Sequence, residues 1–92
     1  MLDKKFYANK QKVYEIKDDI LTYYFKDGRI KAFGHFVNNK MEGEWLFYRE
    51  SGQLWQIGNF LHNLKHGQWQ RFNRDGNIEY LANFQEGRLI KK

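Results

Sequence analysis

The chain has 92 residues, which indicates one domain that can bury only roughly two-thirds of its unfolded surface. It has no cysteine, which excludes a disulfide framework and a thiolate metal site, and no apolar run approaches the ~20 residues that span a bilayer. The net charge of +5 is spread along the chain, which is more typical of a solubility feature than of a surface that binds nucleic acid or anionic lipid.

Residues 1–18 form a lead-in that does not align with the rest of the chain. The first residues are charged and polar and lack an apolar stretch, so we expect no signal peptide and a cytoplasmic protein. Residues 13–16 alternate between apolar and polar side chains, which predicts an extra strand beside the next element. Residues 1–12 are interpreted either as a loose lead-in or as a further strand.

Residues 19–90 repeat with a period of 24 and no insertion, in copies that cover 19–42, 43–66 and 67–90, and a short charged tail ends at residue 92. A fixed period of this size indicates a repeat architecture, in which similar units stack and function lies on an extended surface. Among the aligned positions are Gly28/Gly52/Gly76, Tyr24/Tyr48/Phe72, Phe36/Phe60/Phe84 and Gly34/Gly58/Ala82.

The middle copy shows what one repeat predicts. Residues 44–48 and 53–60 are rich in aromatic and apolar side chains and predict two strands. Residues 49–52 predict the turn between them, with Gly52 at the position that needs a positive φ. Asn63, aligned with Asn39 and Gly87, predicts a second tight turn with left-handed backbone before the next copy.

These patterns predict an all-β meander of three hairpins in one antiparallel sheet, preceded by the extra N-terminal strand. No apolar period of 3.6 residues persists beyond one turn, so no helix is expected. The small residue at Gly34 and Gly58 lies inside a strand, where glycine often marks a close approach. We expect it to make room for an aromatic ring from the neighbouring hairpin.

The repeat resembles the MORN repeat, and most closely a bacterial variant described as an antitoxin component of toxin–antitoxin systems. The resemblance covers about residues 19–90, although the first copy has Asp19 in place of the leading glycine and Leu21 in place of the tryptophan. It implies an elongated, twisted sheet of stacked hairpins that binds other molecules rather than catalysing a reaction. In the middle copy, the residues that match the MORN pattern are Gly43, Glu44, Trp45, Tyr48, Gly52, Leu54, Gly58 and Phe60.

Candidate binding residues are those where one copy places an apolar side chain in a column that is otherwise polar. Trp55 aligns with Lys31 and Glu79, and such a side chain is either exposed or covered by something outside the repeat. One candidate cover is the N-terminal segment, and the other is a partner protein, because aromatic residues and arginine dominate binding hot spots. The predicted partner site consists of Trp55, Phe47, Leu46 and Tyr80 as anchors, with Lys31, Arg49 and Arg71 as a charged rim.

Catalysis and metal binding find little support in the sequence. His62 and His66 flank a turn and lack a third ligand, so no metal site is predicted. Asp27 and Asp75 belong to turns, and no nucleophile, triad or phosphate loop is recognisable, so we predict no enzyme, no catalytic residue and no cofactor.

The sequence therefore predicts a protein-binding module, and the resemblance favours one that inhibits a toxin or effector protein by steric occlusion. Two alternatives stay open. The first is a scaffold or homodimer that pairs through the open edges of the sheet, since exposed edges invite strand pairing. The second is binding to anionic lipid or nucleic acid through the lysines, which would weaken steeply with salt.

Overall fold

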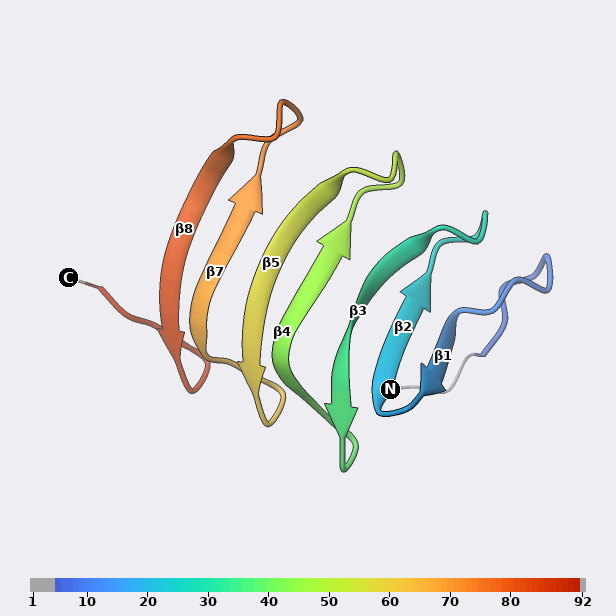
Figure 1. Cartoon of the computed structure of the whole chain (residues 1–92), viewed down its shortest axis with the longest axis horizontal. Helices are drawn as coiled ribbons and strands as arrows, with labels where there is room; N and C mark the ends of the chain where they lie inside the picture. The colour runs from blue at the N-terminus through green and yellow to red at the C-terminus, as the bar shows by residue number, and fades with distance from the viewer. Residues whose placement is uncertain (1–4, 92) are drawn as a thin grey trace.

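The structure is a computed structural model that describes residues 5–91. Nine antiparallel strands form a single-layered sheet with extents of 46 × 35 × 20 Å, and the described residues include no helix. The strands follow one another across the sheet in chain order, except that β6 pairs with the end of β5 (Figure 1). They are β1 Tyr14–Lys17, β2 Ile20–Tyr24, β3 Ile30–Val37, β4 Lys40–Tyr48, β5 Leu54–Leu61, β6 Leu64–Lys65, β7 Gly67–Phe72, β8 Ile78–Gln85 and β9 Arg88–Leu89.

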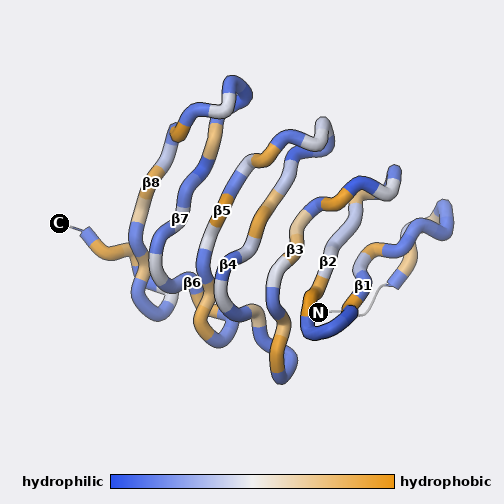
Figure 2. The backbone as a smooth tube through the Cα atoms, in the orientation of Figure 1, coloured by the Kyte–Doolittle hydropathy of each residue, from blue (hydrophilic) through white to orange (hydrophobic). Residues whose placement is uncertain are grey.

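The predicted meander of hairpins and the extra N-terminal strand are confirmed, with β1 paired to β2. The turns at one end of the sheet follow the glycine pattern: Gly28, Gly52 and Gly76 have φ values of 91°, 94° and 85°. At the other end Asn39, Asn63 and Gly87 also have positive φ, as does the residue before each of them. Two consecutive positive φ angles suit the right-handed twist of the adjoining strands. Figure 2 shows these polar turns at both ends of the strands.

The described part of the lead-in repeats the glycine turn without a glycine. Tyr7 accepts from Lys10 and donates to Gln11 through its backbone, the same pair of bonds that Phe25 forms with Gly28 and Arg29. Lys10 stands in the glycine position with φ at 72°. An isolated bridge joins Phe6 and Lys12, so residues 6–12 form a small further turn beside the first hairpin. Residues 1–4 of the predicted lead-in lie outside the described residues.

A tryptophan seated on a glycine joins each hairpin to the next. A Cβ atom at Gly34 would lie 2.3 Å from the Trp45 ring, and one at Gly58 would lie 2.3 Å from the Trp69 ring. Each indole N–H then donates to the carbonyl oxygen one residue beyond its glycine, His35 at 3.0 Å and Asn59 at 2.8 Å. Trp45 is fully buried and Trp69 is 3% exposed. The predicted close approach of a neighbouring ring is thus confirmed.

The first copy has neither the tryptophan nor a glycine opposite it on the preceding strand. Leu21 occupies the tryptophan position, and the residue opposite it on β1 is Ile16, where Trp45 has Gly34. Leu21 is still fully buried. From there an aromatic ladder continues over the same face, with ring centroids between 5.1 and 6.4 Å apart. Its members are Tyr14, Tyr23, Trp45, Phe47, Phe60, Trp69 and Phe84.

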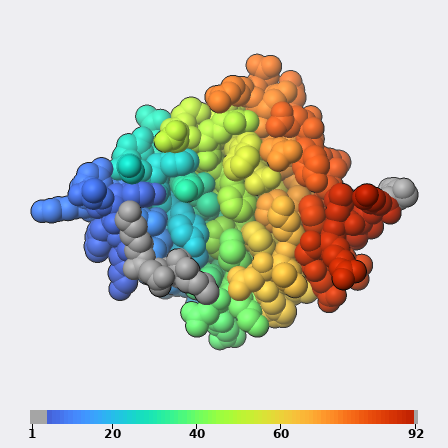
Figure 3. All heavy atoms as spheres, turned by 180° about the vertical axis from the view of Figure 1, so that it is seen from behind, coloured from blue at the N-terminus to red at the C-terminus, as the bar shows by residue number. Residues whose placement is uncertain are grey.

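Side chains also tie the turns of adjacent hairpins together. At the glycine-turn end, Asn9 donates to the Lys26 carbonyl, Arg29 to that of Glu50 and Gln53 to that of Arg74. The three acceptors occupy equivalent positions in the three repeats. At the other end the Glu42 carboxylate accepts from the backbone N–H of His62 at 3.0 Å. These ties leave successive hairpins in contact along the whole sheet, as the continuous bands in the space-filling view show (Figure 3).

Gly58→Ala should lower the free energy of unfolding by about 1–3 kcal/mol, because the added methyl overlaps the Trp69 ring and the core must shift. The reverse change in the third copy, Ala82→Gly, is the control and should cost no more than ~1 kcal/mol, since it only adds backbone freedom. In the Trp69→Leu background Gly58→Ala should cost less than it does in the wild type, because the smaller leucine leaves room for the added methyl. Urea unfolding followed by circular dichroism measures the stability of all three variants. If the effects of Gly58→Ala and Trp69→Leu on the free energy of unfolding are strictly additive, the two residues do not pack against each other as described.

The Glu42–His62 tie should make stability depend on pH. The backbone N–H of His62 lowers the pKa of the Glu42 carboxyl below its ordinary value, with the His62 ring adding to the effect. A lowered pKa means that the carboxylate stabilises the fold above its unfolded pKa, and that this stability is lost as the pH falls through the folded pKa.

Glu42→Gln should therefore be less stable than the wild type at neutral pH, and the difference should shrink at an acidic pH, as the pH falls through the lowered pKa of Glu42. Urea midpoints at both pH values measure this. Glu44→Gln, which changes an exposed carboxylate on the same strand, is the matched control. A deficit for Glu42→Gln that is the same at both pH values would show that the charge is not responsible.

Candidate functional site

The column that contains Trp55 coincides with a β-bulge in every hairpin. Tyr23 pairs with Ala32 but Tyr24 with Ile30, so Lys31 has no opposite residue, and the same shift leaves Trp55 and Glu79 unopposed. A bulged residue is left out of the ladder and its strand bends, so its side chain is aimed differently from those of its neighbours. The column therefore varies because its members do not take part in regular cross-strand packing.

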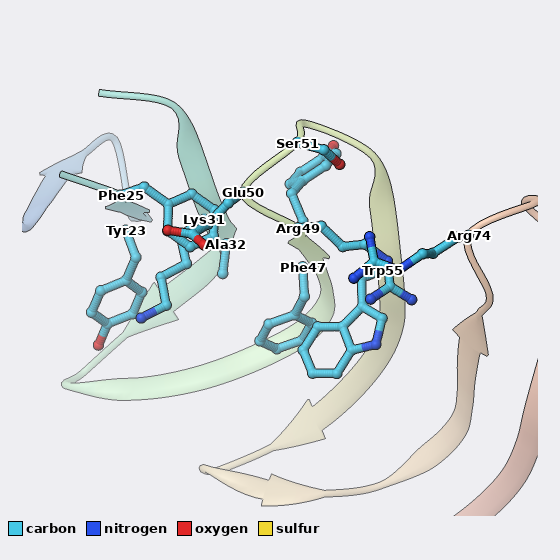
Figure 4. A pocket seen from close by; sticks show the side chains of 11 residues that line it. Tyr23, Phe25, Lys31, Ala32, Phe47, Arg49, Glu50, Ser51, Trp55 and Arg74 are labelled. Atoms are coloured by element: carbon cyan, nitrogen blue, oxygen red, sulfur yellow. The ribbon is translucent and has the colours of Figure 1, made fainter. Parts of the chain in front are cut away.

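A groove of about 630 Å³ lies beside two of these bulges (Figure 4). Its apolar wall is made by the aromatic rings of Tyr23, Phe25, Phe47 and Trp55. Its charged lining consists of Lys31, Arg49 and Arg74, opposed by a single carboxylate, Glu50. A groove of this volume with aromatic walls and a few charged groups is of the size that holds a small ligand or a peptide segment.

Arg49 holds the centre of the groove in place. Its Nη2 donates to the carbonyl oxygen of Phe72 at 2.9 Å, which links the second hairpin to the third. Its guanidinium carbon lies 6.0 Å from the centroid of the Trp55 ring, a cation–π distance. The Arg49 Nε is enclosed and has no hydrogen-bond partner among residues 5–91. Because arginine stays charged, the guanidinium keeps a positive charge at the base of the groove.

The structure brings four of the seven predicted site residues together, since Trp55, Phe47, Lys31 and Arg49 all line this groove. Arg71 and Tyr80 pair with each other on the same face but outside the groove, with the guanidinium carbon 4.7 Å from the ring centroid. Leu46 lies on the opposite face, because side chains alternate along β4 and Leu46 stands opposite Phe33 and Ile57.

Tyr23, Phe25 and Arg74 also line the groove but were not among the predicted site residues. Tyr23 occupies the same column as Phe47, and Phe25 the same column as Arg49, so the column alignment that selected one member contained the other. Arg74 comes from a turn of the next hairpin, and no periodicity of apolar residues would have pointed to it. The N-terminal segment does not supply the cover for Trp55, because residues 5–13 lie beside Tyr24 and Lys26 and none lines the groove.

The two histidines four residues apart have structural contacts. The His62 Nδ1 lies 2.7 Å from a Glu42 oxygen, and His66 Nδ1 accepts the backbone N–H of Glu86 at 3.3 Å. Within residues 5–91 no three side chains of histidine, cysteine, aspartate or glutamate lie close enough to hold a metal ion. The described residues also form no helix long and apolar enough to cross a membrane.

Comparison with known families agrees with the fold. Residues 41–62 and 65–86, which lie in two adjacent repeats of the sequence, each match the family model of the MORN repeat variant. MORN repeats are non-enzymatic modules that generally bind proteins or membranes. Searches of the curated proteins and of the solved structures find no match.

Because the three tryptophans differ in burial, their fluorescence can report on the groove. Trp45 and Trp69 are buried, whereas Trp55 is partly exposed in the groove. Trp55→Phe should therefore remove most of the emission that acrylamide quenches, while Trp69→Phe should leave that component in place. Stern–Volmer plots on variants that retain the wild-type circular dichroism measure this, and an undiminished quenchable component in Trp55→Phe would place the exposed indole elsewhere.

Proposed function

We propose that this chain is a protein-binding repeat module that inhibits a toxin or effector protein by covering its active site. The observation that carries the proposal is the groove of about 630 Å³, in which uncovered aromatic rings and arginine lie together on a rigid sheet. Trp55 and Arg49 are residue types that dominate protein-binding hot spots, and both line the groove. The resemblance to antitoxin components favours an inhibitory role for that binding, in the cytoplasm.

The physical basis of such inhibition is that the sheet needs little ordering on binding. Each hairpin is fixed to the next by a buried tryptophan and by turn-to-turn hydrogen bonds, so its binding face exists before the partner arrives. A preformed surface loses less conformational entropy on association than a flexible one does. The mechanism is occlusion, which requires no chemistry from the module itself.

Self-assembly through the sheet edge is the second candidate, and a specific observation favours it. The last long strand, β8, exposes Ile78 by 53% and Leu81 by 55%, and Leu89 and Ile90 beside it are 46% and 48% exposed. Exposed apolar residues on an edge strand invite pairing with another chain. In this function the apolar edge, rather than the groove, would be the working surface.

Capture of partners from the native host tests the two functions against each other. Tagged wild-type protein should co-purify one other protein, identified by mass spectrometry, and Trp55→Ala should lose it, because an anchoring tryptophan typically contributes 2 kcal/mol or more, a factor of about thirty. Leu81→Glu, which changes the edge, is the matched control and should keep the partner. If wild type captures only itself, and light scattering shows a dimer that Leu81→Glu converts to a monomer, the inhibitor proposal is wrong and self-assembly replaces it.

A further inference from the structure

The charges around the groove differ from those elsewhere on the same face. Two arginines outside it have a carboxylate partner: Arg71 Nε lies 3.4 Å from a Glu79 oxygen, and Arg29 Nε lies 3.6 Å from an Asp27 oxygen. Inside it, Lys31, Arg49 and Arg74 form no ion pair with the described residues. The groove is thus lined by three cations and one carboxylate, Glu50, and carries an excess of positive charge.

The apolar and charged walls of the groove come from different structural elements. Phe47 and Trp55 both line the groove and project from β4 and from the β5 bulge (Figure 4). Lys31 comes from the β3 bulge on one side, and Arg74 comes from the glycine turn before β8 on the other. A ligand lying across the groove therefore meets a cation, then aromatic rings, then a second cation.

We propose that this groove binds a short acidic segment of the partner protein, in which an aromatic or apolar side chain packs against Trp55 and Phe47 and flanking carboxylates pair with Lys31 and Arg74. The inference rests on the proposed function and specifies the part of the partner that is recognised. Arg49 supports the site, because its guanidinium carbon lies 6.0 Å from the Trp55 ring centroid and contributes positive charge to the groove.

The charge pattern favours an acidic peptide over a nucleic acid. A nucleic acid presents a phosphate at every nucleotide and is normally bound by a track of cations along its backbone. Here the neighbouring arginines, Arg71 and Arg29, are ion-paired within the chain, and a carboxylate, Glu50, lies among the three cations that line the groove, so the groove is not a continuous track of cations. A patch of this extent matches a few carboxylates around one apolar anchor.

The proposal is tested with arrayed peptides and the full-length protein. Each peptide carries one phenylalanine in an alanine–serine background, with an increasing number of neighbouring positions changed to aspartate or, in a matched series, to lysine. Binding should rise with the number of aspartates, stay low with lysine, and weaken with added salt. Trp55→Ala should reduce the affinity of the best peptide about thirty-fold.

Charge reversal locates the binding. The double variant Lys31→Glu with Arg74→Glu should weaken the aspartate peptides at least about tenfold, because like charges then face the carboxylates. Lys40→Glu with Arg88→Glu makes the same change in net charge at exposed positions outside the groove and should bind like wild type. Equal binding by the two double variants, or a preference for lysine peptides, overturns the proposal.

Two further measurements separate this inference from its alternatives. If a single-stranded oligonucleotide binds more tightly than the best peptide and is lost in the groove variant, the ligand is nucleic acid and the peptide proposal is wrong. If the co-purified partner is retained by the groove double variant, the protein-binding function stands and the acidic-segment inference fails. If wild type captures no partner, the proposed function fails, and aspartate-dependent peptide binding still decides the specificity of the groove.

Discussion

The packing of a tryptophan ring onto a glycine is the constraint on which the rest of this sheet depends. A single-layered sheet has no second layer to cover its apolar side chains, so each hairpin must bury its large residues against the next one. Trp45 and Trp69 do so by lying where Gly34 and Gly58 have no side chain, and the indole N–H reaches a carbonyl oxygen that the close approach brings within 3.0 Å. The polar atom of the largest side chain is thereby satisfied inside the sheet, which removes a cost that burial would otherwise impose.

The same constraint explains why the copies differ where they do. Leu21 lies opposite Ile16 rather than a glycine, and this copy has leucine in place of tryptophan. The turns are bound to one another independently, because equivalent carbonyl oxygens at Lys26, Glu50 and Arg74 each accept from the hairpin before. Two sets of contacts, one in the middle of the strands and one at their ends, keep successive hairpins aligned, and the groove is positioned by both.

The fold was predictable because its determinants are local and repeat in register. Glycine or asparagine at each turn requires positive φ, and the 24-residue spacing of Gly52 and Gly76 places equivalent strands side by side. The small turn at Lys10 was not predictable, since no glycine marks it. The candidate site was only partly predictable: column alignment finds Trp55 and Phe47, but a column by itself does not tell which face of the sheet its side chains meet, and alternation along β4 places Leu46 on the face opposite Phe47. Arg74 reaches the groove from a turn, where alternation carries no information.

The bulges also separate what the sheet needs in order to fold from what its surface presents. Lys31, Trp55 and Glu79 have no opposite residue in the ladder, so the identity of each is scarcely restrained by the hydrogen bonds and ring contacts that hold the hairpins together. A substitution there alters the chemistry of one face while the glycine seats and turns stay intact. Arrays with the same backbone would thus acquire new ligand preferences by changing one residue per hairpin, at little expense in stability, and the specificity of such proteins would diverge faster than their architecture.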